Sequence, residues 1–238
     1  MFPSFLSQSI LATVWISCRA MNSSASTPLR RAAIAQLCST SSKIQNLADI
    51  AKCAGQAKKE GASMLFLPEC FGFIGASSQE TLENAEPPIR EDDSTNVDRV
   101  REYLARIVYS SAQTTFGTPS DFPKPDHIDV DGKITLLDGL RTIAQESGLW
   151  ISAGGMHESG APPANGDKIS RVYNSHVILD NNGIIKASYR KSHLFDVSIP
   201  GKFSLQESLT TAPGTKLVIC DSPVGTLTRP KQANECGL

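Results

Sequence analysis

The sequence lacks the cysteine spacings that mark a metal site or a disulfide framework. Its six cysteines include no CxxC pair and do not cluster with the four histidines, although the common zinc sites need such spacings. We therefore expect no metal and no cofactor, and most thiols should be small core residues or inert surface groups. Scattered free thiols are typical of a reducing compartment, so we predict a cytoplasmic or mitochondrial location.

An excess of charge and a long apolar run are also missing. The net charge is -1 over 238 residues, and the sequence pI is about 6.4. No overall basic field exists to hold nucleic acid or an anionic membrane. The apolar run of residues 10–16 is far too short to span a bilayer. We therefore exclude nucleic acid and membranes as partners and expect a globular chain with a sizeable core.

Acidic residues are absent from the first part of the chain. No Asp or Glu precedes Asp49, whereas Arg19, Arg30, Arg31 and many Ser and Thr residues do. This composition is typical of a transit peptide, and the alternative is an untargeted disordered tail. We assign residues 1–31 to this segment.

After residue 31 the chain alternates apolar runs with amphipathic stretches. Residues 32–37 and 64–67 are predicted to be buried strands, and residues 44–54 have the apolar spacing of a helix that stops before Gly61. Apolar runs without strict alternation favour a mixed or parallel sheet covered by helices. The predicted fold class is α/β or layered α+β.

A second strand–helix unit and two hairpins follow. Residues 137–144 are predicted to form a helix that Gly148 ends, and residues 149–151 a strand that enters a loop at Gly154-Gly155. Asn182-Gly183 supplies the positive φ angles that a tight turn between strands needs. The predicted hairpin strands are residues 172–179 with 184–189, and residues 216–220 with 224–227.

Residues 88–136 have a different character. A helical stripe is followed by a Pro- and Asp-rich run over residues 119–131, and this polarity favours a surface excursion outside the core. We treat residues 88–136 as an insertion. The stripe consists of Val97, Val100, Leu104 and Ile107.

Glu69 directly follows the predicted strand 64–67, at the rim where open α/β sheets hold their ligands. If Phe66, Phe71 and Phe73 surround this carboxylate, desolvation raises its pKa toward the value that a general base needs. The alternative is a solvated rim glutamate.

Lys191 lies in a polar cluster, residues 189–196, at the end of a hairpin strand, where a cation could stabilise developing negative charge. Such a cluster is more often simply solvated. We expect His193, which lies within it, to orient loops and not to bind a metal ion. Glu207 follows on a long loop, after Pro200-Gly201.

Three segments together resemble the nitrilase superfamily of carbon–nitrogen hydrolases. They are LPEC at residues 67–70, YRKSHLFD at residues 189–196, and a PGK and QES loop at residues 200–208. The resemblance covers residues 32–87 and 137–227, and within the superfamily it points to the branch of deaminated glutathione amidase and ω-amidase. It implies an αββα sandwich that acts on a small amide.

The resemblance also implies roles for these residues. Glu69 matches the general base of a Glu–Lys–Cys triad, Lys191 the lysine that stabilises the oxyanion, and Glu207 a second glutamate that orients that lysine and the substrate. Amides are poor electrophiles, so covalent catalysis divides their hydrolysis into acylation with loss of ammonia and deacylation by water.

The family's nucleophile is not found where its motif predicts it. The register beyond residues 225–227 places Gln232 at that position, and Pro230 removes a ladder donor from what would be a buried central strand. We therefore expect no turnover from this chain. Three other thiols do not match the family position: Cys70, Cys220 and Cys236.

This break predicts a partial hydrolase domain over residues 32–227, incomplete at its C-terminus, and a divergent tail over residues 228–238. Retained intronic sequence or a splice-truncated product would explain it. The alternative function is a non-catalytic interaction protein that pairs with a full-length relative, and the family otherwise implies a homodimer. A half-covered core with an exposed strand edge predicts aggregation or dependence on a partner.

Overall fold

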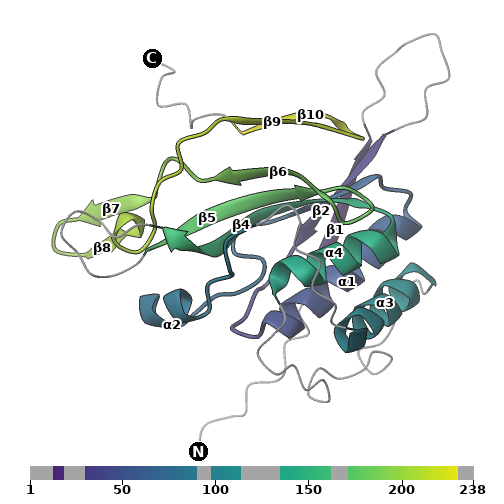
Figure 1. Cartoon of the computed structure of the whole chain (residues 1–238), viewed down its shortest axis with the longest axis horizontal. Coiled ribbons are helices and arrows are strands. Elements are labelled where there is room, and N and C mark those ends of the chain that lie inside the picture. Colours follow the sequence, from purple (N-terminus) through teal and green to yellow (C-terminus); the bar gives the residue numbers. More distant parts are fainter. Residues whose placement is uncertain (1–12, 19–29, 90–97, 114–134, 162–170, 230–238) are drawn as a thin grey trace, which may run out of the picture.

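A six-stranded mixed sheet is the centre of the fold (Figure 1). The computed structural model describes residues 13–18, 30–89, 98–113, 135–161 and 171–229. Strand order follows the sequence, β2 to β4 run parallel, and the other neighbours are antiparallel. The strands are β1 (Thr13–Cys18), β2 (Arg31–Gln36), β3 (Met64–Leu67), β4 (Trp150–Ala161), β5 (Arg171–Leu179) and β6 (Ile185–Arg190). The predicted mixed sheet is confirmed.

Helices α1 (Lys43–Lys59) and α4 (Leu136–Ser147) cover one face of this sheet, and α3 (Asp98–Gln113) packs against these two helices. The hydroxyls of Ser42 and Thr135 cap the first turns of α1 and α4 by accepting backbone N–H groups. Gly148 ends α4 with a φ of 71°, which a residue with a Cβ adopts at a cost. Both predicted helices are confirmed.

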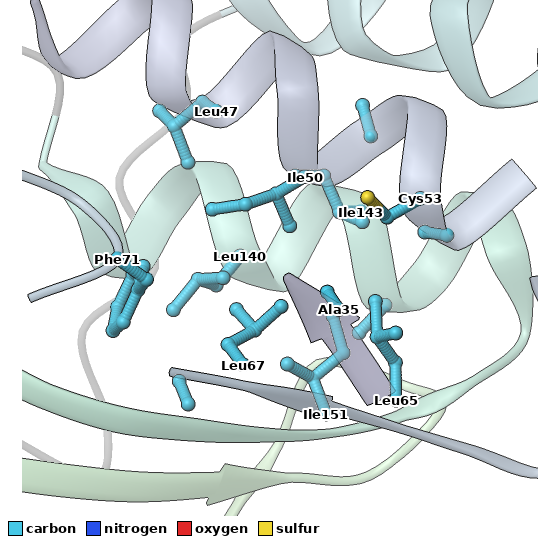
Figure 2. Close-up of a cluster of buried hydrophobic side chains, with 14 of the residues drawn as sticks. Ala35, Leu47, Ile50, Cys53, Leu65, Leu67, Phe71, Leu140, Ile143 and Ile151 are labelled. Atoms are coloured by element: carbon cyan, nitrogen blue, oxygen red, sulfur yellow. The ribbon is translucent and has the colours of Figure 1, made fainter. Parts of the chain in front are cut away.

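The main core lies between these helices and the sheet (Figure 2). Alternate residues of the central strands point into it, and each large side chain buried there contributes about 1.5–3 kcal/mol. Fully buried members include Leu47, Ile50, Leu65, Phe71, Leu140, Ile143 and Ile151.

Helix α3 belongs to this core, so the prediction that residues 88–136 lie outside it is wrong for this helix. Leu104 and Ile107 are 0% and 1% exposed, and Tyr103 and Val108 are buried beside them. Their spacing gives one apolar face that packs toward α1 and α4, while the polar residues occupy the other face. Residues 119–131 lie outside the described residues.

Strand β4 corrects a second prediction, the loop at Gly154-Gly155. The strand continues to Ala161 and pairs with β5, with a register shift between Ala153 and Met156. The two glycines therefore mark an irregularity within one continuous strand. Glycine inside a strand often marks such a bulge, as well as a loop.

Part of the predicted N-terminal segment is also ordered. Residues 13–18 form β1 and pair antiparallel with β2 at the edge of the sheet. The alternative in which all of residues 1–31 form a disordered tail is therefore wrong for this stretch. The transit peptide remains a prediction.

The remaining elements are short. The β5–β6 hairpin is confirmed: Gly183 has a φ of 75°, and Oδ1 of Asp180 accepts the N–H groups of Asn182 and Ile184. The hairpin β9–β10 is confirmed too, and it packs over the second face of the sheet against Met64. These elements are α2 (Ser78–Glu83), β7 (Asp196–Ile199), β8 (Phe203–Gln206), the 3-10 helix η3 (Glu207–Leu209), β9 (Val218–Ser222) and β10 (Gly225–Arg229). No helix in the described part of the chain is long and apolar enough to cross a membrane.

Candidate active site

Glu69 lies two residues beyond the end of β3, in an open cleft of about 1010 Å³. The chain turns sharply there, because Cys70 has a φ of 56° and its N–H donates to the carbonyl of Gly155 at 2.9 Å. This turn places Glu69 on the cleft wall. The wall also includes Asn174, Tyr189, Lys191, His193, Phe195, Leu205 and Glu207.

Lys191 is the first residue after β6, and its backbone is held on both sides. Its N–H donates to the carbonyl of Asn174, and its own carbonyl accepts the N–H of Gly214, both at 2.8 Å. The preceding Arg190 forms a two-point ion pair with the fully buried Glu158, at 2.6 and 3.0 Å. These contacts fix the point from which the lysine side chain enters the cleft.

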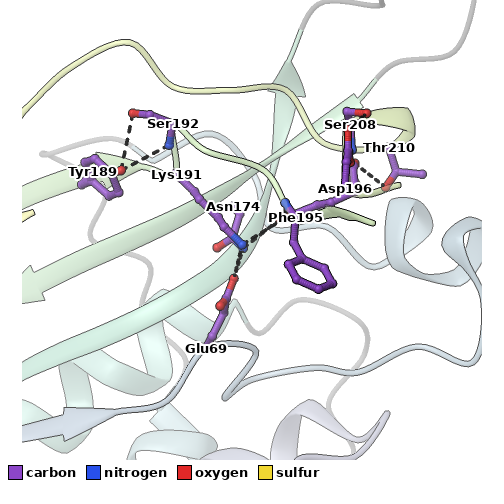
Figure 3. A network of polar contacts seen from close by, with 10 residues as sticks. Glu69, Asn174, Tyr189, Lys191, Ser192, Phe195, Asp196, Ser208 and Thr210 are labelled. Carbon is purple, nitrogen blue, oxygen red and sulfur yellow. Dashed lines mark hydrogen bonds and ion pairs between the residues drawn. The ribbon is translucent and has the colours of Figure 1, made fainter. Parts of the chain in front are cut away.

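The Lys191 ammonium lies between two carboxylates, and Figure 3 shows its side chain pointing toward Glu69. Its Nζ is 3.1 Å from Oε1 of Glu69 and 3.0 Å from Oε2 of Glu207. Glu207 begins η3 and is held further by the backbone N–H of Phe195, which donates to Oε2 at 2.7 Å. The structure therefore brings together the three residues that the sequence singled out, from segments far apart in the chain.

The electrostatics of the cluster favour a charged lysine. Burial opposes protonation of Lys191, but hydrogen bonds and attraction from Glu207 and Glu69 outweigh it and raise the lysine pKa. The single cation of Lys191 faces two carboxylates, so their oxygens can also accept hydrogen bonds from an uncharged donor.

Asn174 on β5 supplies that donor and was missed from the sequence. Its Nδ2 donates to Oε1 of Glu69 at 2.5 Å and approaches Oε1 of Glu207 at 3.4 Å. Gly155 makes room for it: a Cβ there would lie 2.3 Å from Oδ1 of Asn174 and 2.8 Å from Cγ of Glu69. No signal in the sequence singled out Asn174, because two more polar residues, Ser175 and His176, follow it on β5.

The predicted aromatic surroundings of Glu69 are wrong. The Glu69 side chain is 53% exposed. Phe71 is in the main core beneath the helices, and Phe66 packs on the opposite face of the sheet. Phe66 lies on β3, where alternate side chains point to opposite faces, and Phe71 follows the turn at Cys70, so closeness in sequence did not bring these rings to the carboxylate.

The cleft also holds histidines. Burial lowers the pKa of His157 on β4, although Glu207 and Glu69 act in the other direction. The buried Nδ1 of His193 has no hydrogen-bond partner among the described residues. No group of three side chains suited to hold a metal ion occurs in the described residues.

None of the thiols whose environment is described is placed as an activated nucleophile. Cys70 lines the cleft, but burial and then the charges of Glu69 and Glu207 raise its pKa, against a smaller effect of Lys191. Cys220 lies on β9 and is buried against the second face of the sheet. Cys53 is in the main core, where burial raises its pKa to about 12. A raised pKa keeps a thiol protonated and slow to react. Gln232 and Cys236 lie outside the described residues.

A glutamate at a strand end and a lysine between two carboxylates form an arrangement that can exchange protons and stabilise negative charge on an oxygen atom. The sequence profile described as Carbon-nitrogen hydrolase matches residues 31–231. The chain belongs to the carbon–nitrogen hydrolase family.

Several relatives carry amidase names. A deaminated glutathione amidase from Homo sapiens is 34% identical over 204 residues, which are 86% of this chain and 47% of that protein. An omega-amidase from Mus musculus is 26% identical over 81% of this chain and 51% of its own length. The crystal structure of the Caenorhabditis elegans NitFhit protein has a TM-score of 0.53 at 25% identity, covering 82% of this chain and 35% of that one. The chain thus spans about half the length of the amidases it matches.

Proposed function

We propose that the cleft binds a small ω-amide and carries the acid/base and oxyanion-stabilising part of an amide-hydrolysing site. One observation supports this above the others: Nζ of Lys191 lies within 3.1 Å of Glu69 and 3.0 Å of Glu207 in an open cleft. The half-exposed Glu69 can exchange protons with a bound molecule. Lys191 can donate a hydrogen bond to a carbonyl oxygen that becomes negative during reaction.

In this proposal each residue has one role. A thiolate attacks the amide carbon, and Glu69 takes up the thiol proton and passes it to the departing ammonia. Glu69 then activates a water molecule that hydrolyses the acyl-enzyme. Lys191 stabilises the oxyanion of both tetrahedral intermediates, and Glu207 orients Lys191.

No thiol in the described residues is placed to supply the thiolate. From the sequence register we place Gln232 at the nucleophile's position, and burial raises the pKa of Cys70. We therefore propose that the 238-residue chain binds the amide without hydrolysing it. The acyl group that best fits is of the deaminated glutathione type, since a relative of that name has the higher identity, 34% against 26% for the omega-amidase. A 2-oxoglutaramate-like substrate is the alternative.

Ammonia release and amide binding, measured on the purified chain, test this proposal. We expect no ammonia above the blank from deaminated glutathione or 2-oxoglutaramate, but binding detectable by calorimetry. Lys191→Ala should weaken that binding about tenfold, because a charged hydrogen-bond donor is lost. Glu69→Gln, which keeps the shape of the side chain, should weaken binding less.

Two results would overturn the proposal. Turnover that Cys236→Ser abolishes would show an active nucleophile outside the described residues. Binding that is unchanged in Lys191→Ala would show that the amide does not occupy this cleft. Co-purification with a longer relative, without amide binding, would instead favour the non-catalytic interaction protein.

A further inference from the structure

Asn174 makes contacts with three residues of the candidate site, Glu69, Glu207 and Lys191. Its side chain donates to Glu69 and approaches Glu207, and its backbone carbonyl accepts the N–H of Lys191. The residue is 5% exposed and lies on β5, which is paired on both sides, with β4 and with the edge strand β6. Strand β5 therefore presents the side-chain amide of Asn174 to both carboxylates.

The orientation of this amide follows from its partners. Ionised carboxylates only accept hydrogen bonds, so the NH₂ group must face Glu69 and Glu207. The oxygen Oδ1 then points to Gly155, where an added Cβ would come within 2.3 Å of it. A residue larger than glycine at position 155 would push the amide out of place.

The charges explain why a neutral donor belongs here. Glu69 and Glu207 share a single ammonium, that of Lys191. A second cation would compete for the position that a substrate carbonyl needs. An amide NH₂ group binds both carboxylates without adding charge. The other titratable groups that line the same cleft are Cys70, His157, His176, Tyr189 and His193.

We infer that Asn174 is a positioning residue, which holds Glu69 and Glu207 at the separation that one lysine bridges and keeps Glu69 ionised and aimed into the cleft. The relevance of this role to amide hydrolysis rests on the proposed function. The geometric claim can be tested without any ligand.

The test is a carboxyl-¹³C NMR titration of the full chain labelled at glutamate, with Glu69 assigned from Glu69→Gln. Removing a hydrogen-bond donor disfavours the ionised form, so Asn174→Ala should increase the proton affinity of Glu69 about three- to tenfold. Asn174→Asp has the same shape but adds a third negative charge, so it should increase that affinity further.

Ser175→Ala is the matched control, because Ser175 is the next residue on β5 and its hydroxyl donates to Glu158 instead. It should leave the titration of Glu69 unchanged. The inference is overturned if folded Asn174→Ala titrates like the unmodified chain, or if Ser175→Ala shifts Glu69 equally. Failure of both Asn174 variants to fold would make Asn174 a folding residue and would overturn it too. Because the titration contains no amide substrate, a negative result would contradict the role of Asn174 without contradicting the proposed function.

Discussion

Cys70 shows how a single residue determines the shape of the site. It adopts a left-handed backbone conformation, φ 56°, which costs a residue with a Cβ about 1 kcal/mol. The hydrogen bond from its N–H to Gly155 holds this conformation and turns Glu69 into the cleft. The same turn leaves the thiol partly buried and close to two carboxylates.

This setting predicts a slow thiol. Alkylation requires the thiolate, and burial, Glu69 and Glu207 raise the pKa of Cys70, so less thiolate exists at neutral pH. We expect iodoacetamide at pH 7.5 to modify Cys70 several-fold more slowly than the exposed Cys38, as measured by peptide mass spectrometry. The rate at Cys70 should keep rising as the pH increases toward its raised pKa.

Two variants separate the causes of this slow reaction. Glu69→Gln should speed modification of Cys70, because it removes a charge that raises the pKa, and Lys191→Ala should slow it, because Lys191 lowers the pKa. If Cys70 reacted faster than Cys38, the thiol would be activated, and its exclusion as a nucleophile would be wrong.

Individual site residues differed in how far sequence could predict them. Glu69 follows an apolar run, and a strand end is a position with a known geometric consequence. Lys191 and Glu207 were weak signals alone and became specific through their common resemblance to one family. Asn174 and Gly155 could not be predicted, because their roles depend on which side chain lies across a strand pair. A single sequence does not show which residues of β4 and β5 lie opposite each other.

At the scale of elements, the same limit explains which predictions were right. Strand β3 and helices α1 and α4 depend on local spacing and capping, so their patterns sufficed. Strand β4 continues through Gly154-Gly155 because β5 pairs with it on the far side of that irregularity. Helix α3 is flanked by breakers and charges, and only its packing against α1 shows that it is part of the core.

The place of α3 in the core makes a measurable prediction. Leu104→Ala should lower the free energy of unfolding by about 2–5 kcal/mol, since it removes a fully buried side chain and leaves a cavity. Tyr109→Ala on the same helix is the control. Its side chain is 67% exposed, and the change should be within about 0.5 kcal/mol. Urea unfolding followed by circular dichroism measures both, and equal effects would mean that α3 does not pack as described.

For the whole molecule, the two faces of the sheet are covered unequally. Helices α1 and α4, with α3 packed on them, bury one face, whereas the hairpin β9–β10 packs on the other through a small cluster that includes Met64, Ile178 and Cys220. Ile34 on β2 is 53% exposed, between Ala33 and Ala35 of the main core, so it points to this second face. Leu217 and Ile219, 65% and 71% exposed, are on the side of the hairpin away from that cluster. Apolar groups gathered in this way favour association.

We therefore expect the 238-residue chain to self-associate at micromolar concentration, which sedimentation velocity would detect as species heavier than the 25.6 kDa monomer. Replacing Leu217 and Ile219 with lysine should shift the distribution toward the monomer, because like charges then oppose contact between hairpins. Ile74→Lys is the control, since Ile74 is 50% exposed but lies outside this hairpin. The free energy of unfolding should change by less than about 0.5 kcal/mol for each of these exposed positions. If the double variant sediments as the unmodified chain does, association does not use the hairpin, and the exposed face near Ile34 becomes the surface to test.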